Sequence, residues 1–285
     1  MASRVLMRTP ELTLGEFVCA PGDPLWEQVN TNMGAWPHVV FPRRHVLIVQ
    51  DGAQPVLTTP NHVVFYRPHQ LYRRGLRDPR GDRSLWLEVT PALLEEAAGK
   101  PPAGPAGPSD ARTYLLAVAL AGHLVAEQAP DRLLAEEAAL RLLALAVDGG
   151  TRPGQAGARR RRTRGDHEAL AEAAKELLVE RVSLPPSLRD LATALSVSPF
   201  HLARVFRSRT GFSLSGYVHG LRLRRAVDRL AAEPDVDLSR LALDLGYCSP
   251  SHFSDRFRAT FGCPPSALRG TQLRTIVEAR NPISA

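Results

Sequence analysis

The hydrophobic positions of this chain change their period about one third of the way along it. Over residues 11–90, short apolar runs such as Val46–Val49 and Val63–Tyr66 alternate with turn residues such as Asp51-Gly52. Short strands at this spacing predict a β-barrel or a β-sandwich. The first third of the chain is therefore expected to be a β unit.

Helical patterns follow the β region. Thr90-Pro91 predicts the start of a helix over residues 91–98, because proline is favoured at the first helical position. Leucines three to four residues apart then predict two helices, over 109–128 and 130–147. These two helices would form a hairpin packed on the β unit, and the same hairpin could provide a dimerisation surface. The two interpretations are compatible.

A polar segment, residues 149–165, separates this hairpin from the rest of the chain. It holds five glycines, Pro153 and the run Arg159–Arg162, a composition that predicts a flexible basic linker. Its arginines lie either in a solvated hinge or beside DNA, where each neutralised phosphate releases counterions. Six arginines and no acidic residue fall here, so most of the net charge of +7 comes from this segment. Bulk charge is therefore weak support for nucleic-acid binding elsewhere.

The most informative pattern is an internal repeat. The pentapeptides 198–202 and 249–253 share a Ser-Pro-x-His-hydrophobic pattern and stand 51 positions apart, while the Leu-Ala pairs 191–192 and 241–242 stand 50 apart. Each copy predicts a short helix, a turn and a second helix, and the change of one residue falls in the turn. Two helix-turn-helix copies in one chain predict a protein that binds DNA in two places.

The second helix of each copy has an apolar and a polar face. In the first copy, Leu202, Val205 and Phe206 form the apolar stripe, and three phenylalanines do so in the second. The opposite face of the first copy suits a major groove, because arginine donates two hydrogen bonds to guanine and Phe or Ala contacts the thymine methyl group. The side chains expected to read bases are Phe200, Ala203, Arg204, Arg207, Ser251, His252 and Asp255.

A third helix, predicted up to residue 232 from Ser213 or Ser215, connects the two copies. About 18 residues at a rise of 1.5 Å would span roughly 27 Å. This is close to the roughly 34 Å between successive major-groove faces, so one protomer could read two adjacent grooves. For the arginines of this connector, a solvated face is the alternative to phosphate contact. The residues expected at phosphates are Ser198, His201, Arg222, Arg225, Ser249, Ser254 and Arg258.

These residues resemble the AraC/XylS family of bacterial transcription regulators. The resemblance covers about residues 166–270 and rests on both pentapeptides, with Tyr217, Gly246-Tyr247 and Phe261-Gly262. It implies an all-α domain of about seven helices, in which a long helix joins two helix-turn-helix units. It also implies an N-terminal cupin-like β-barrel that senses a small molecule or drives dimerisation. The base-contacting positions that it carries over are Phe200, Ala203, Arg204, Ser251, His252 and Asp255.

The fold class expected is therefore a multidomain α+β protein. Its expected parts are a cupin-like β-barrel over 1–98, a helical hairpin over 109–148, a linker over 149–165, an AraC-type DNA-binding domain over 166–270 and a tail over 271–285.

The β region offers residues for an effector pocket, although all of them also suit the core and rim of a barrel. They are Trp36, Arg43, Arg44, Tyr66, Tyr72 and Trp86. A metal-binding cupin would show an HxH pair followed by a glutamate in a glycine-framed motif, which the scattered histidines do not form. No cofactor, metal or catalytic residue is expected.

The leading interpretation is a sequence-specific, effector-responsive transcription activator rather than an enzyme. It would bind double-stranded DNA as a homodimer and contact RNA polymerase, and an effector would shift the sites that the pair spans. No apolar run could cross a bilayer, and Met1–Pro10 lacks a signal-peptide core, so a bacterial cytoplasmic, nucleoid-associated location is expected. Two alternatives stay open: a constitutive dimerising DNA-binding protein without ligand, and a cupin enzyme fused to a DNA-binding module.

Overall fold

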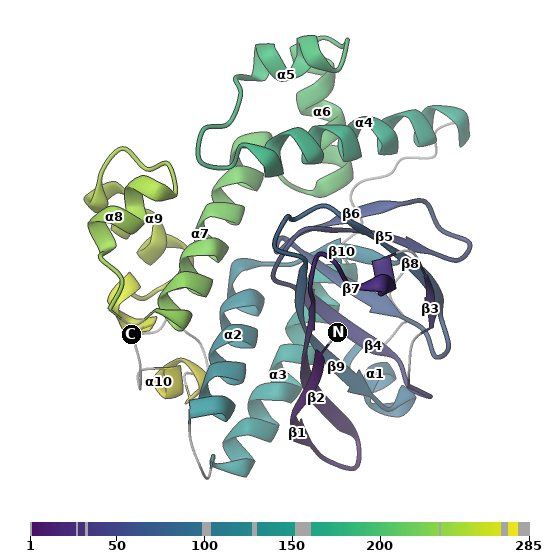
Figure 1. Ribbon diagram of the computed structural model, residues 1–285, viewed down its shortest axis with the longest axis vertical. Helices are drawn as coiled ribbons and strands as arrows, with labels where there is room; N and C mark the ends of the chain where they lie inside the picture. Colours follow the sequence, from purple (N-terminus) through teal and green to yellow (C-terminus); the bar gives the residue numbers. More distant parts are fainter. Residues whose placement is uncertain are drawn as a thin grey trace.

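The strands of this protein lie in its N-terminal part and helices make up the rest (Figure 1). The computed structural model describes residues 2–26, 28–31, 34–98, 104–126, 130–151, 161–233, 235–268 and 273–278. The mixed α and β composition expected from the sequence is therefore confirmed.

The described strands form two antiparallel sheets, with the orders β1-β2-β9-β4-β7-β10 and β3-β8-β5-β6. Their bounds are β1 Ala2–Arg8, β2 Leu12–Cys19, β3 Val29–Thr31, β4 His38–Pro42, β5 Val46–Gln50, β6 Val56–Thr58, β7 His62–Tyr66, β8 Leu71–Leu76, β9 Asp82–Val89 and β10 Ala106–Pro108. Among the described residues no strand pairing joins the two sheets, so the closed barrel expected from the sequence is not formed.

Strand β7 shows why the run Val63–Tyr66 has no alternation of apolar and polar residues. Val63 and Phe65 pack in the core that the larger sheet shares with the helices, while Val64 and Tyr66 pack against β5 of the smaller sheet. Successive side chains of a strand point to opposite faces, so a strand covered on both faces needs apolar residues at every position. The larger sheet is thus the middle layer, between the smaller sheet and the helices.

The helices agree closely with the sequence pattern. Their bounds are α1 Pro91–Ala98, α2 Ala111–Ala126, α3 Arg132–Thr151, α4 Arg161–Glu180, α5 Leu188–Ala194, α6 Pro199–Thr210, α7 Leu214–Ala232, α8 Leu238–Asp244, α9 Pro250–Phe261 and α10 Leu273–Glu278, with 3-10 turns η1 Pro24–Trp26 and η2 Pro265–Leu268. The expected linker 149–165 is helical at both ends, because α3 continues to Thr151 and α4 begins at Arg161. Its centre, with Arg159 and Arg160, lies outside the described residues.

The C-terminal helices pack on the N-terminal half rather than standing apart from it. One hydrophobic cluster continues from the larger sheet through α2 and α3 to α7, α8, α9 and α10. Helix α10 lies against α2 and α3, where Arg141 of α3 donates a hydrogen bond to the carbonyl oxygen of Val277 at 2.7 Å. The hairpin expected to drive dimerisation therefore already carries part of the C-terminal half on its surface.

Candidate nucleic-acid interface

The first helix-turn-helix unit consists of α5 and α6. The Ser187 hydroxyl accepts a hydrogen bond from the Asp190 amide at 3.2 Å, and the Asp190 carboxylate accepts one from the Ser187 amide at 3.3 Å. This reciprocal capping box fixes the start of α5. Ser198 caps α6 by accepting from the His201 amide at 3.2 Å, and Gly211 ends the helix at a φ of 78°.

The second unit, α8 and α9, repeats this construction. Asp237 caps α8 by accepting from the Ser239 amide at 2.8 Å. Ser249 caps α9 by accepting from the His252 amide at 3.1 Å, and Gly262 ends it at a φ of 77°. The helix starts and ends expected for both copies from serine, proline and glycine positions are therefore confirmed.

The turns of the two units have the same backbone path. The Val197 amide donates to the Ala192 carbonyl at 3.0 Å, and the Tyr247 amide donates to the Ala242 carbonyl at 3.0 Å. One residue of each turn is left-handed, but it is Ser196 (φ 54°) in the first unit and a glycine, at position 246 (φ 79°), in the second. Because the paths match as far as residue 247, the extra residue of the second copy is Cys248.

Helix α6 presents one exposed face that includes an aromatic side chain. Phe200 is 79% exposed, whereas Phe206 on the opposite face is fully buried. A phenylalanine in that position adds little to the folded core, so it is available to a ligand. Arg204 and Arg207 are exposed beside it, and Ala203 is half-buried between them. The four side chains expected to read bases thus lie together.

Helix α9 presents a different face. Ser251, Asp255 and Arg258 are exposed, and Ser254 is half-buried. His252 is exposed too, and its two ring nitrogens lie 3.1 Å from the Cys248 sulfur and 3.4 Å from the Arg256 Nε. This face therefore combines one acidic side chain with hydroxyls and basic groups.

The sequence repeat does not point to Arg256. The 51-residue offset pairs it with Val205, which is buried in the first unit, so the repeat hides its role as an exposed cation. Asp255, Arg256 and Arg258 stand at positions i, i+1 and i+3 of α9, and all three are exposed on its outer side. This helical spacing points to Arg256, whereas the repeat does not.

The connector helix α7 holds its arginines against other parts of the molecule. Arg222 donates to the carbonyl oxygens of Val182 at 2.8 Å and Ser183 at 2.9 Å, just after the end of α4. Arg225 is half-buried, and burial followed by the nearby Arg80 charge lowers its pKa. The structure therefore does not group these two arginines with the side chains of α6 or α9.

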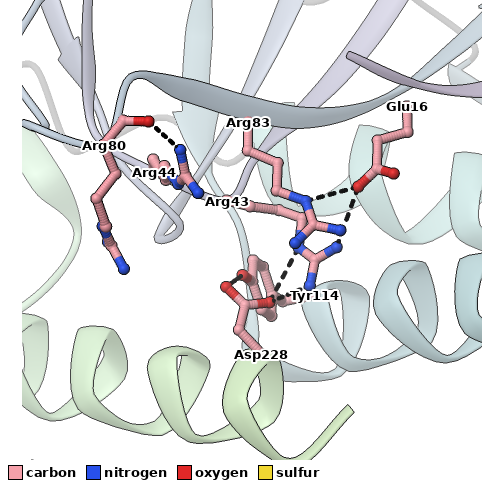
Figure 2. Close-up of polar contacts among 7 residues, drawn as sticks. All are labelled: Glu16, Arg43, Arg44, Arg80, Arg83, Tyr114 and Asp228. Carbon is pink, nitrogen blue, oxygen red and sulfur yellow. Dashed lines mark hydrogen bonds and ion pairs between the residues drawn. The ribbon is translucent and has the colours of Figure 1, made fainter. Parts of the chain in front are cut away.

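A polar cluster joins α7 to the β unit, as Figure 2 shows. Arg43 donates to one carboxylate oxygen of Asp228 at 3.0 and 2.7 Å, and the Tyr114 hydroxyl donates to the other at 2.8 Å. Glu16 lies 3.4 Å from Arg43 and 2.7 Å from Arg83. Burial opposes the charge on Arg43, but Asp228 and the other neighbours raise its pKa above the ordinary value. These five residues are called the α7 clamp below.

Three further hydrogen bonds attach α7 to the N-terminal half. Arg224 is buried and donates to the Ser109 carbonyl oxygen at 2.6 Å, and burial lowers its pKa to about 10. Nearer the start of α7, the Tyr217 hydroxyl lies 2.9 Å from the Thr59 hydroxyl, and the Asn61 amide donates to the Tyr217 carbonyl oxygen at 2.9 Å. The connector is therefore held along its length.

A cavity of about 470 Å³ lies between the two sheets. Tyr66, Tyr72 and Trp86, three of the residues predicted for an effector pocket, line it, whereas Trp36 lines a separate, smaller hollow. In the described part of the chain, the other two expected pocket residues lie outside the cavity lining. Arg43 belongs to the α7 clamp, and Arg44 donates to the Arg80 carbonyl oxygen (Figure 2).

No group of three or more His, Cys, Asp or Glu side chains among the described residues could hold a metal ion. No described helix is both long and apolar enough to cross a bilayer.

Comparisons with known proteins agree on the C-terminal part. The family model described as a helix-turn-helix domain matches residues 191–271. The transcriptional regulator GlxA of Rhizobium meliloti is 33% identical over 104 residues, which are 36% of this chain and 32% of GlxA. The regulatory protein SoxS of Salmonella typhimurium is 30% identical over 103 residues, which are 36% of this chain and 95% of SoxS.

Among solved structures, an AraC-type transcriptional regulator from Chromobacterium violaceum is 29% identical, with a TM-score of 0.34, and the match covers 38% of this chain and 96% of that one. This chain spans about a third of the length of GlxA. The family match thus covers most of the first helix-turn-helix unit and all of the second.

Proposed function

Because the chain belongs to the AraC/XylS family of transcription regulators, we propose that it binds specific sites on double-stranded DNA through α6 and α9. The observation that carries this proposal is the exposed face of α6, where Phe200, Arg204 and Arg207 lie together on a helix whose other face is buried. Arginine recognises guanine with two hydrogen bonds, and an aromatic ring can contact a thymine methyl group.

Each protomer would read two adjacent major-groove segments. The connector α7 has 19 residues, so its axis is roughly 28 Å long at a rise of 1.5 Å per residue. That length is comparable with the roughly 34 Å between successive major grooves on one side of B-DNA. The contacts that hold α7 along its length favour a fixed spacing between the two reading helices.

Phosphate contacts would fix the register of each helix on DNA. The proposed contacts at the helix starts are Ser198, His201 and Ser249, and those on the flank of α9 are Ser254 and Arg258. Arg222 and Arg225 would have to leave their present surroundings to reach a phosphate, which makes them the weakest members of this proposed set.

We further propose that the cupin-like β unit senses a small molecule in the cavity and passes the signal to α7. Strands β2 and β9 carry the argument, because neighbouring residues on them face opposite sides. Phe17 and Asp82 line the cavity, whereas Glu16 and Arg83 belong to the α7 clamp. A ligand that shifts either strand would therefore also shift the support of the connector.

The remaining parts of the proposal rest on the family. The regulator would act in the cytoplasm as a homodimer formed through α2 and α3, activate transcription with RNA polymerase and carry out no catalysis. The alternative is a constitutive DNA-binding protein with no ligand, in which the α7 clamp keeps one fixed arrangement.

Selection of bound sequences from random DNA tests the DNA-binding proposal directly. The purified full chain should enrich a two-part site whose halves are separated by about one helical turn. On that site, Arg204→Ala should weaken binding by about 1–3 kcal/mol and relax one base preference. Arg112→Ala, which removes an equal charge from an exposed position of α2, is the control. Enrichment of no sequence, or equal loss on random DNA, would show the proposal to be wrong.

A further inference from the structure

The cavity between the sheets contains a buried pair of opposite charges that do not satisfy each other. Arg74 of β8 and Asp82 of β9 both line it, and their nearest charged atoms, Nη1 and Oδ2, lie 3.9 Å apart. This distance is too long for a hydrogen bond. Among the described residues, neither Arg74 Nη1 nor Asp82 Oδ1 has a hydrogen-bond partner, although both atoms are buried.

Such atoms are costly to bury, because a polar group without a partner loses its hydration and gains nothing in return. The environment of Asp82 agrees with this, since burial raises the pKa of its carboxyl group to about 6 despite the nearby Arg74. The guanidinium of Arg74 is held in place, with its Cζ 4.1 Å from the centre of the Phe17 ring. A donor held in place and a buried acceptor therefore lie near each other in the cavity.

The rest of the cavity wall is mainly apolar. Val40, Ile48 and Val64 line it, and the rings of Tyr66 and Tyr72 lie 4.7 Å apart beside Arg74. A volume of about 470 Å³ lies within the range of pockets for small molecules, roughly 300–1,000 Å³. The body of a ligand would therefore be apolar or aromatic.

The charges restrict the polar group of that ligand. A carboxylate could accept from Arg74 but would be repelled by Asp82 and by Glu88, which also lines the cavity. An amine could donate to Asp82 but would be repelled by Arg74. An ester would leave the carboxylate of Asp82 without a donor. A neutral amide satisfies both groups, because it carries an acceptor oxygen and a donor nitrogen bonded to the same carbon.

We propose that this cavity binds a neutral, largely apolar molecule bearing a carboxamide or lactam group, whose carbonyl oxygen accepts from Arg74 Nη1 and whose N–H donates to Asp82 Oδ1. The assignment rests on the proposed sensing role of the β unit and specifies the chemistry of its ligand. A water molecule bridging the pair would be displaced without loss, since the amide reproduces both hydrogen bonds.

The test uses four probes of nearly equal shape, titrated into the full chain without DNA and followed by ligand-detected NMR and calorimetry. They are 4-phenylbutanamide, 4-phenylbutanoate, methyl 4-phenylbutanoate and 4-phenylbutylamine. The amide should bind at least about tenfold more tightly than each of the others, because each of them leaves one buried group unpaired or repelled. Tightest binding by the carboxylate or the amine, equal binding by the ester, or no amide binding at millimolar concentration would overturn the proposal.

Two variants separate recognition from folding. Arg74→Met should reduce amide binding at least about tenfold, while Arg73→Met, at an exposed neighbouring position of the same strand, should leave it unchanged. Asp82→Asn should keep amide binding, since asparagine still offers an acceptor, but should improve carboxylate binding and so reduce the selectivity ratio. An unchanged ratio in Asp82→Asn would contradict the role of this carboxylate even if Arg74→Met failed to fold.

The outcomes for the ligand and for DNA are independent. Selective amide binding by a chain that enriches no DNA sequence would overturn the proposed regulator function and support the cavity chemistry. Sequence-specific DNA binding by a chain that does not bind the amide would support the proposed regulator function and overturn the cavity chemistry.

Discussion

The two helix-turn-helix units share a backbone and differ in the side chains that they expose. Both have a serine cap on the second helix, a left-handed residue in the turn and a left-handed glycine at the end. On the outer face, however, Phe200 and Arg204 of α6 correspond to Ser251 and Asp255 of α9 under the 51-residue offset. The repeat therefore preserves the residues that build the motif. Of the side chains expected to read bases in α6, it keeps Arg207, as Arg258, but not Phe200 or Arg204.

The units also differ in the elements on which their buried faces pack. The first packs on α4 and on Leu57 of β6, in a hydrophobic cluster of its own. The second belongs to the large cluster that includes α2, α3 and α10. The second unit, whose outer face includes the acidic Asp255, thus packs on more elements than the first. This difference favours positioning for the second unit and base selection for the first.

Gly246→Ala gives the largest expected effect on this comparison. A methyl group at position 246 would overlap the Ser183 carbonyl oxygen, and the left-handed backbone disfavours any side chain. The free energy of unfolding should fall by about 3 kcal/mol or more, measured in urea. Ser196→Ala at the equivalent turn is the matched control and should change stability little, since that turn already holds a non-glycine residue. Equal losses in both variants would mean that the second turn has no special constraint.

Asp228→Asn tests whether the α7 clamp supports both units alike. The change removes the carboxylate charge next to the buried Arg43, so that Glu16, at 3.4 Å, is the negative charge left beside it. A loss of roughly 2–3 kcal/mol in unfolding free energy is expected, near the low end for a broken buried pair because Asp228 is partly exposed. The DNA sequence selected by this variant should keep both halves. A change in one half alone would show that the clamp acts on a single unit.

Arg256→Ala tests whether the second unit positions the protein on DNA through phosphate contacts. If Arg256 contacts phosphate, its removal should weaken binding to specific and random DNA by the same few-fold factor and reduce the salt dependence of log K by about 1. The measurement is a titration at several salt concentrations. A loss confined to the specific site would instead make Arg256 a base-reading residue.

Ser196→Gly gives the smallest expected effect, with the opposite sign to Gly246→Ala. Ser196 has a φ of 54°, a region that costs an ordinary residue roughly 1 kcal/mol and glycine nothing. The melting temperature should rise by a few degrees. The entropy that glycine adds to the unfolded chain makes this rise smaller than the relief of the left-handed conformation alone would give. A lower melting temperature would show that the serine side chain makes a stabilising contact.

Much of the DNA-binding half could be predicted because its signals are local. Helices α5 to α9 follow from caps, a proline at the first position and glycines at the ends, all within a few residues of each other. The same local reasoning predicted strands in the first third, but it could not show that the strands form two sheets without closure.

Contacts between distant residues left no such signal. The sequence predicts Arg43 as a pocket residue, yet its partner Asp228 lies 185 positions away in the sequence. Arg224 looks like a solvated arginine of an amphipathic helix, and only the packing of α7 on Ser109 makes it buried. Arg74 and Asp82 are two charges among many until β8 and β9 come to line one cavity.

The unequal roles of the two units are tested most directly by the DNA sites that the wild-type chain selects from a random pool, compared with those of Arg204→Ala and Asp255→Ala. The half read by α6 should show the stronger base preferences. Arg204→Ala should remove a preferred base at a cost of about 1–3 kcal/mol, and Asp255→Ala should leave the site nearly unchanged. Equal preferences in both halves, or a larger change from Asp255→Ala, would contradict the account.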